Sequence, residues 1–350
     1  MATQRKHHHT VIIGSGQSGL STGYYLKKNN IDFVILDENE RTGDSWRKRW
    51  DSLKLFTPAQ YDGLPGMPFP GEKNSFPAKN SVALYLEAYA RKFDLPVKNG
   101  VKVTSLSHSD GLFSIDTSAG KFTADNVVIA TGTHPLPKVP LFAGELSKEI
   151  FQIHSSDYQN PEQLPEGDVL VVGAGVSGVE IALEVSATRN TYIAGEPTFH
   201  IPDNVFKYFG RMYWWLVYSL ITVKTPVGKK ARSRVLHGGG PLIGVSADDL
   251  DKAGIERLSR VTGVQNGFPE MEDGRIVRVS SIIWCTGFKP DFSWCMSDVT
   301  DETGWPRTDR GISLSYKGLF FMGMPFQFGL TSGLLGGVGR DAAFIAKHIN

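Results

Sequence analysis

Short, uninterrupted runs of apolar residues recur along this chain and indicate its fold. They stand at residues 10–13, 33–36, 127–130, 169–172 and 191–194, and runs of this length and composition are typical of strands buried on both faces of a parallel sheet. The residues between them predict helices over 17–29 and 176–187. A further strand is expected at 318–323, followed by a closing helix at 332–348. Strands that alternate with helices in this way predict an α/β fold.

One unit of this pattern occurs twice. The first strand leads into the turn Gly14-Ser15-Gly16-Gln17-Ser18-Gly19, and a helix, a second strand and the acid Asp37 follow. The second copy has the turn Gly173-Ala174-Gly175-Val176-Ser177-Gly178 and the acid Glu196. In both copies the acid stands 23 positions after the first glycine, close to the roughly 20 positions that separate a glycine-rich turn from a ribose-binding acid. Two matched copies predict two dinucleotide-binding, Rossmann-like domains.

Prolines and a repeated strand ending indicate how the two domains are connected. Pro135, Pro137 and Pro140 follow the strand that ends in Thr131-Gly132, and a second apolar strand, at 282–285, also runs into Thr-Gly. Proline clusters of this kind mark breaks between elements. We therefore expect residues 1–150 to form the first part of one domain, 151–284 to form a second domain inserted into it, and 285–350 to complete the first.

The glycine turns carry the chemistry. The first glycine of such a turn allows its tight geometry, the second lets backbone approach a pyrophosphate, and the third lets the helix pack on the strand. Unpaired N–H groups and the positive end of the dipole at the helix start favour an anion there. Asp37 can accept hydrogen bonds from ribose hydroxyls. Two dinucleotides in one enzyme suggest hydride transfer between a nicotinamide and a flavin.

Composition and charge exclude several other functions. The net charge is only +1, so the chain as a whole has no electrostatic field that would attract nucleic acid. The expected partners are small molecules. The two cysteines, Cys285 and Cys295, lie ten positions apart and form no C-x-x-C redox pair. The apolar stretch 212–223 has twelve residues, fewer than the roughly 20 that a membrane-spanning helix needs. With no leader pattern and no metal-ligand spacing, we expect a cytoplasmic protein without a metal site and without firm membrane association.

Several further segments resemble one family. These are Gly43-Asp44-Ser45-Trp46, the stretch from Leu53 to Pro58, Phe76-Pro77, Ala130-Thr131-Gly132, His154 to Tyr158, and Gly336 to Asp341. Together with the glycine turns they resemble the flavin-containing and Baeyer–Villiger-type monooxygenases, the class B flavoprotein monooxygenases, and most closely their small bacterial members. The resemblance covers nearly the whole chain.

The resemblance implies FAD at the Gly14 turn and NADH or NADPH at the Gly173 turn. The implied reaction is transfer of one oxygen atom from O₂ to a small apolar sulfide, amine or ketone through a C4a-(hydro)peroxyflavin. Phe56 and Thr57 are the candidate catalytic residues. The implied cofactor-binding residues are Gly14, Ser15, Gly16, Gln17, Ser18, Gly19, Asp37, Glu38, Ser45, Trp46, Leu55, Thr131, Gly132, Gly173, Gly175, Val176, Ser177, Gly178, Glu196, Cys285, Thr286 and Gly287.

The sequence departs from the family pattern at three places. The signature F-x-G-x-x-x-H-x-x-x-[WY] keeps His154 and Tyr158 but has Lys148 and Ile150 in place of its aromatic residue and glycine. Phe56 and Thr57 stand where many members have an asparagine that steadies the flavin–oxygen adduct. Glu196 stands where members specific for NADPH place an arginine near the 2′-phosphate. We therefore expect NADH to be used at least as well as NADPH, unless Lys229, Lys230, Arg232 and Arg234 supply the missing charge.

Two questions stay open at the level of sequence. One is whether the chain is instead an NAD(P)H oxidase, an NAD(P)H:acceptor reductase without oxygen transfer, or a flavin-binding sensor. The other concerns an unusually aromatic segment, which could be core, a contact between subunits of a homodimer, or a lid over an apolar substrate. Its residues are Phe206, Tyr208, Phe209, Tyr213, Trp214, Trp215 and Tyr218.

Overall fold

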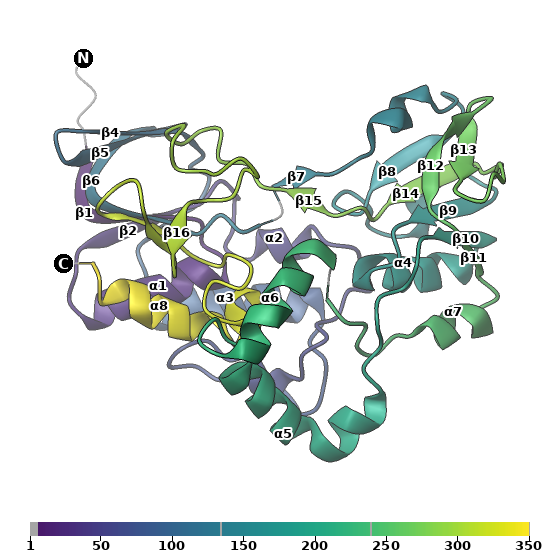
Figure 1. The fold of residues 1–350 in the computed structure, drawn as a ribbon. Helices are drawn as coiled ribbons and strands as arrows, with labels where there is room; N and C mark the ends of the chain where they lie inside the picture. Colours follow the sequence, from purple (N-terminus) through teal and green to yellow (C-terminus); the bar gives the residue numbers. More distant parts are fainter. Residues whose placement is uncertain (1–5, 134, 239, 350) are drawn as a thin grey trace.

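A computed structural model describes residues 6–133, 135–238 and 240–349, with the side chains of all but residues 203, 207 and 234–238. In this described part of the chain two separate, mainly parallel sheets are each covered by helices, one on either side of Figure 1. The predicted fold class, two dinucleotide-binding units in an α/β arrangement, is confirmed by this architecture and by the solved structures that it resembles.

The first sheet is built around the N-terminal glycine turn. Its order is β16-β17-β18-β6-β1-β2-β3, and β5 pairs with the first half of β6 and with β4. The strands from β18 to β3 run parallel. Their bounds are β1 Lys6–Ile13, β2 Phe33–Leu36, β3 Val97–Lys98, β4 Val103–Ser109, β5 Leu112–Thr117, β6 Gly120–Ile129, β16 Thr308–Asp309, β17 Ile312–Ser313 and β18 Leu319–Phe321.

Helices α1 (Gln17–Lys28), α3 (Lys79–Lys92) and α8 (Val338–Ala346) cover one face of this sheet. Alternate residues of the buried strands supply the two cores: Ile12 and Ile35 pack toward these helices, whereas Val11 and Val34 pack toward β4 and β5 on the other face. Because both faces are covered, the buried runs 11–13, 33–36, 127–129 and 319–321 consist of apolar residues, as the sequence predicted.

The second sheet has the order β11-β10-β9-β14-β8, with all neighbours parallel. Helices α4 and α7 cover one face, and η2 and the hairpin β12–β13 cover the other. The bounds are β8 Phe151–His154, β9 Val169–Val172, β10 Thr191–Ala194, β11 Glu256–Leu258, β12 Val261–Gln265, β13 Phe268–Met271, β14 Ser281–Trp284, α4 Val176–Ser186, α7 Ala247–Lys252, η2 Leu141–Glu145 and η3 Pro161–Gln163.

The chain passes between the two sheets through a pair of short strands. β7 (Leu136–Pro137) on the way out pairs antiparallel with β15 (Phe288–Lys289) on the way back. The backbone N–H of Lys138 also donates to the carbonyl of Gly287 at 2.9 Å. We propose the boundaries 150/151 and 284/285 for the two units, since β8 begins at Phe151 and β14 ends at Trp284.

A loop after β2 also joins the two units. The short helix α2 (Asp44–Arg47) leads into this loop, and Trp50 and Leu53 are buried in the core of the second unit. The backbone N–H of Asp51 donates to the carbonyl of Gln159 at 2.7 Å. Trp46 packs against the cores of both units.

The aromatic segment forms a third connection. Helices α5 (Asp203–Leu220) and α6 (Pro226–Gly238) follow β10 but extend below both sheets in Figure 1 and pack against η4 (Leu330–Gly333) of the first unit. Backbone hydrogen bonds of 2.8 Å from Val223 to Phe328 and 3.0 Å from Leu330 to Ile221 hold the contact. Arg340 of α8 donates to the carbonyl of Tyr218 at 2.8 Å.

One sequence expectation needs adjustment. The closing helix begins at Val338, not at Ser332, because the Ser332 hydroxyl accepts hydrogen bonds from the N–H groups of Phe328 and Gly329 and holds a separate 3₁₀ turn there. The stretch 212–223 divides between α5 and the turn that follows it. In the described residues, no helix is both long and apolar enough to cross a membrane.

Candidate active site

The two glycine turns have the same geometry. Gly14 has φ +107° and Gly173 has φ +109°, a left-handed backbone that favours glycine. A Cβ on Gly14 would lie 2.5 Å from the carbonyl oxygen of Ala130, and one on Gly173 would lie 2.4 Å from that of Cys285. The two strands that end in Thr-Gly, one after Ala130 and one after Cys285, therefore pack against the two turns in the same way.

The third glycine of each turn allows the helix to pack on the turn. A Cβ on Gly19 would stand 1.9 Å from the carbonyl oxygen of Gly14, and one on Gly178 would stand 1.7 Å from that of Gly173. These separations are far below any allowed contact. No residue with a side chain fits at either position without moving the helix.

The middle glycine of each turn faces open space. Gly16 precedes α1 and Gly175 precedes α4, and an added Cβ at either position meets no described atom within 4 Å. Gly132 and Gly287, at the ends of the neighbouring strands, are open in the same sense. The space in front of each helix start thus fits a pyrophosphate held by backbone N–H groups.

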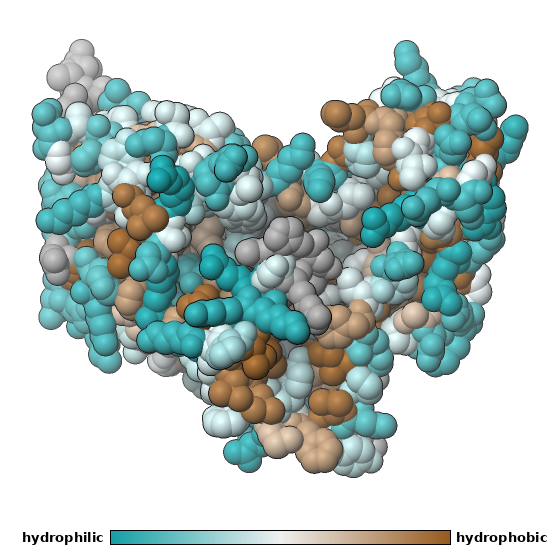
Figure 2. All heavy atoms as spheres, in the orientation of Figure 1, coloured by the Kyte–Doolittle hydropathy of each residue, from teal (hydrophilic) through white to brown (hydrophobic). Residues whose placement is uncertain are grey.

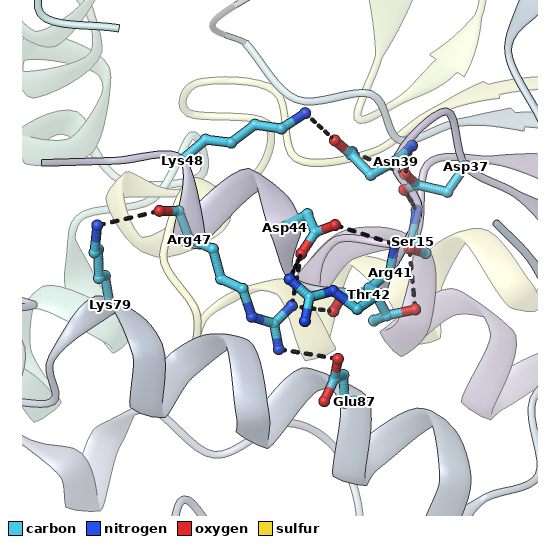
Figure 3. Close-up of polar contacts among 10 residues, drawn as sticks. All are labelled: Ser15, Asp37, Asn39, Arg41, Thr42, Asp44, Arg47, Lys48, Lys79 and Glu87. Atoms are coloured by element: carbon cyan, nitrogen blue, oxygen red, sulfur yellow. Dashed lines mark hydrogen bonds and ion pairs between the residues drawn. The ribbon is translucent and has the colours of Figure 1, made fainter. Parts of the chain in front are cut away.

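The predicted acid of the first turn is tied to the turn itself. Asp37 is buried, and its carboxylate accepts a hydrogen bond of 2.6 Å from the N–H of Ser15 and bonds of 2.8 and 2.9 Å from the backbone and side chain of Asn39 (Figure 3). A carboxylate has about four acceptor sites, and these three bonds leave one on Oδ2, so Asp37 can still accept a bond from a ribose. Its neighbour Glu38 is exposed and pairs with Lys102 at 3.6 Å.

The segment with the family's G-G-x-W pattern is fixed by ion pairs. Asp44, which replaces the second glycine, is buried and binds Arg47 at 2.8 Å and Arg41 at 3.2 Å, and Arg47 continues to Glu87 of α3 at 2.9 Å (Figure 3). These charges allow a carboxylate where the pattern expects glycine. They anchor the segment of Ser45 and Trp46 next to the first turn.

Other predicted residues have partners that define their place. Ser18 lies in the first turn of α1 against Gly323, at the end of β18. Thr286 donates its hydroxyl to the carbonyl of Lys138 and therefore supports the crossing between the units. Leu55 packs on the core of the first unit. The remaining predicted residues, Gln17, Val176, Ser177 and Thr131, lie in the first turns of α1 and α4 and at the end of β6.

Neither cysteine is suited to disulfide chemistry. Burial raises the pKa of Cys285 to about 12 and that of Cys295 to about 12. Both therefore stay protonated thiols at neutral pH. Because the thiolate is the reactive form, neither is a reactive cysteine.

His154, kept from the family signature, lies at the crossing between the units. Its Nδ1 accepts from the N–H of Ser156 at 3.1 Å, so Nε2 carries the proton and donates to the carbonyl of Gly287 at 3.1 Å. Burial lowers the pKa of His154, which favours this neutral form. The residue positions the second crossing strand, and it belongs to no cluster of three or more potential metal ligands among the described residues.

The candidate catalytic residues lie in the segment before η1 (Ala59–Tyr61). Thr57 is buried and its Oγ1 donates to Oδ1 of Asp62 at 2.6 Å. The carbonyl of Tyr61 approaches Gly336 so closely that a Cβ there would stand 1.6 Å from it. The segment is thereby held against the residues that lead into α8.

Asp62 is a functional candidate that the sequence did not reveal. It is fully buried, and its Oδ2 has no hydrogen-bond partner among the described residues. Burial raises its pKa to about 7, although the hydrogen bond from Thr57 opposes the shift. A carboxyl that titrates near neutral pH is typical of functional sites.

An aromatic pocket of about 1270 Å³ lies beside this segment. Pro58 and Tyr61 form one side, and Phe206 and Trp214 of α5 form another; Lys73 and Arg211 add positive charge. Phe56 packs in the same apolar cluster. Of the predicted aromatic segment, Phe206, Tyr213 and Trp214 contribute to this cluster, whereas Phe209, Trp215 and Tyr218 are exposed.

The second turn ends near an exposed carboxylate. Glu196 follows Gly195, which has φ +108° and whose added Cβ would lie 3.8 Å from the N–H of Ala174 in the glycine turn. The basic residues considered as substitutes for an arginine, Lys229, Lys230 and Arg232, belong to α6, which packs against η4. The side chain of Arg234 lies outside the described residues.

We expect Asp62→Asn to change the pH dependence of stability. The wild-type carboxyl is protonated more readily in the fold than in the unfolded chain, so its contribution is full below about pH 4 and is lost as pH rises through about 7. Asparagine does not titrate, so the variant keeps its free energy of unfolding where wild type loses it. The difference in the free energy of unfolding should grow in favour of the variant by up to about 1.4 kcal/mol per pH unit across that window.

Urea unfolding at several pH values measures this difference. Asp110→Asn, at an exposed turn, is the matched control and should run parallel to wild type. A constant difference between Asp62→Asn and wild type from pH 5 to about pH 8 would contradict the assignment.

Comparison with known proteins places these features in context. The family model described as pyridine nucleotide-disulphide oxidoreductase matches residues 11–196. The chain is 39% identical over 342 residues to an uncharacterized CzcO-like oxidoreductase of Geobacillus kaustophilus, with 97% of both chains covered. It is 28% identical over 385 residues to a probable indole-3-pyruvate monooxygenase, YUCCA8, of Arabidopsis thaliana, covering 97% of this chain and 88% of the relative. A flavin-containing monooxygenase from Stenotrophomonas maltophilia superposes with a TM-score of 0.82, at 28% identity and with 98% of both chains covered.

Proposed function

Because the chain belongs to the pyridine nucleotide-disulphide oxidoreductase family, and within it to the class B flavoprotein monooxygenases, we propose that it transfers one oxygen atom from O₂ to a small apolar sulfide, amine or ketone. The enzyme is a flavin-dependent oxidoreductase, and such monooxygenases use FAD and NADPH in general. The finer proposal is that FAD binds the Gly14 turn and that NADH or NADPH binds the Gly173 turn.

The observation that carries the proposal is the open space in front of the helix starts at Gly16 and Gly175, in a chain without a reactive thiol. We call these two spaces the first and the second cradle. Two dinucleotides allow hydride transfer from one to the other. A disulfide cannot take the electrons onward, since the two cysteines form no C-x-x-C pair and both stay protonated. Oxygen is then the natural acceptor.

The assignment of FAD to the first cradle rests on what surrounds it. The Trp46 segment and Thr57 follow the first turn in sequence, and the start of α8 comes close to Tyr61. FAD, when bound, would supply the two-electron chemistry that activates O₂. The residues of this chain would hold it: backbone at Gly14 to Gly19 for the pyrophosphate, Asp37 for the ribose.

The pocket walls support the proposed substrate class. Phe206, Phe209 and Trp214 line the pocket with flat apolar surfaces, which suits a small apolar molecule. Lys73 and Arg211 at the pocket would favour substrates that also carry a negative group. A relative's name, probable indole-3-pyruvate monooxygenase, is consistent with an aromatic ring joined to a carboxylate.

Oxygen transfer is tested with ¹⁸O₂. We expect methyl phenyl sulfide or a small cyclic ketone to gain one labelled oxygen atom in the presence of NADH or NADPH, with some reduced nicotinamide lost to H₂O₂. Mass spectrometry of the product and a peroxide assay measure the two outcomes. No labelled product from a panel of thioethers, amines and ketones, with all NADH recovered as peroxide, would refute the proposal.

That outcome would favour the second candidate, an NAD(P)H oxidase. One observation supports it: the Thr57 hydroxyl donates to Asp62 and is not available as a donor toward the flavin, where many relatives have an amide. An unmet hydrogen bond at this place would release oxygen as H₂O₂ more readily. We therefore expect partial uncoupling even in a monooxygenase.

A further inference from the structure

Helix α5 exposes an apolar surface at the tip of the molecule. Its exposed fractions are 61% for Trp215, 57% for Phe209 and 54% for Met212, and Leu220 and Val227 beside them are also exposed. We call these five residues the apex patch. Figure 2 shows hydrophobic side chains gathered over this lower tip, with polar ones around them.

The same helix is also apolar on its inner side, where Trp214 and Val217 are buried against the first unit. Burial of the inner side is therefore enough to hold α5 in the fold, and the apolar residues on its outer side are not used for packing. An exposed apolar patch that the fold does not need marks a surface for binding something else.

The charge of the segment that carries the apex patch has one sign. Residues 204–247 contain seven Lys and Arg and no Asp or Glu, so this segment carries +7, whereas the whole chain carries +1 and the remainder therefore −6. Arg211, Lys224, Lys229, Lys230 and Arg232 are exposed in the structure.

This charge decides between two occupants. In a symmetric dimer formed through the apex patch, the same positive residues of two copies would face each other and repel. A lipid surface with anionic head groups outside and acyl chains beneath complements both the positive charge and the exposed apolar side chains of the segment. Clusters of four to eight basic residues on an amphipathic helix are typical of anionic lipid binding.

We propose that the apex patch docks reversibly onto an anionic lipid surface. Trp215 and Phe209 enter the boundary between head groups and acyl chains, and the surrounding Lys and Arg side chains bind the head groups. The segment lies on the surface and does not cross it. A small apolar substrate dissolved in the lipid is then presented to the pocket directly, since Phe209 and Met212 belong both to the apex patch and to the pocket lining.

Vesicle sedimentation with the full-length, flavin-loaded protein tests the proposal. One set of vesicles is phosphatidylcholine alone, and the other contains about 30% phosphatidylglycerol. We expect at least tenfold tighter binding to the anionic vesicles at about 0.1 M salt, and most of that binding to be lost at about 1 M salt, where surface charges are screened.

Variants separate the apolar and the charged contributions. Trp215→Ser combined with Val227→Ser should weaken vesicle binding roughly tenfold or more and leave NADH oxidation in solution unchanged, because neither residue lines the pocket. Leu141→Ser, at a side chain that is 99% exposed on η2, is the matched control and should bind as wild type does. Replacing Lys229, Lys230 and Arg232 together by alanine should remove most of the preference for anionic vesicles.

Three results would overturn the proposal. The first is equal binding of wild type to neutral and anionic vesicles, and the second is no binding to either. The third is a dimer in analytical ultracentrifugation that the Trp215/Val227 double variant converts to monomer without any change in vesicle binding. That last result would make the apex patch a contact between subunits.

Discussion

Gly16→Val should purify as a folded, colourless protein. Gly16 has φ −72°, which valine adopts, and an added Cβ meets no described atom within 4 Å. The new methyl groups would instead fill the space in front of α1, where the pyrophosphate of FAD needs the backbone N–H groups. Losing two hydrogen bonds to a charged group, each worth about 1.5–3 kcal/mol, corresponds to a flavin affinity lower by roughly 1000-fold.

The flavin absorbance of the purified protein measures this effect, and circular dichroism shows that the variant is folded. Gly175→Val is the matched control: the same change at the equivalent position of the second cradle, where an added Cβ is equally free. It should purify yellow, be reduced by dithionite, and fail to be reduced by NADH or NADPH. A yellow Gly16→Val protein together with a colourless Gly175→Val protein would show that the two cradles are assigned the wrong way round.

Glu196→Arg should turn the enzyme toward NADPH. Glu196 is exposed beside the second glycine turn, where its carboxylate can accept bonds from both ribose hydroxyls and repels a 2′-phosphate. An arginine in its place would pair with that phosphate. We expect the ratio of kcat/KM for NADPH over NADH to rise about 100-fold, equivalent to about 2.7 kcal/mol.

Steady-state kinetics with both nucleotides give this ratio. Glu38→Arg, the same change at an exposed acid next to the first cradle, should leave it unchanged. A wild-type preference for NADPH of about 100-fold would show that Glu196 does not face the ribose.

The elements that the sequence predicted correctly are those fixed by neighbouring residues. A run such as Val169–Val172 needs burial on both faces wherever it occurs, and the turns at Gly14 and Gly173 carry their geometry in three glycines each. The equivalence of the strand ends at Ala130 and Cys285 was also visible, because the same short pattern occurs twice. Local rules suffice for these features.

What could not be predicted depends on contacts between distant residues. Asp62 becomes a buried carboxyl because the segment around Tyr61 packs against Gly336, 275 positions further along the chain. Helix α5 carries apolar residues on its exposed side as well as on its buried side, so its sequence gives no sign that it packs against η4. The site residues implied by the family resemblance, Phe56 and Thr57 among them, remain predictions until the variants above are measured.

The pairing of β7 with β15 bears on how a fold of this kind can arise. The segment between Lys138 and Gly287 leaves and re-enters the first unit at one point, because these two residues are hydrogen-bonded to each other. A module whose two ends meet in space can be spliced into a surface loop of another protein without stretching its host. The pair of short strands β7 and β15 is all that is needed to close such a joint.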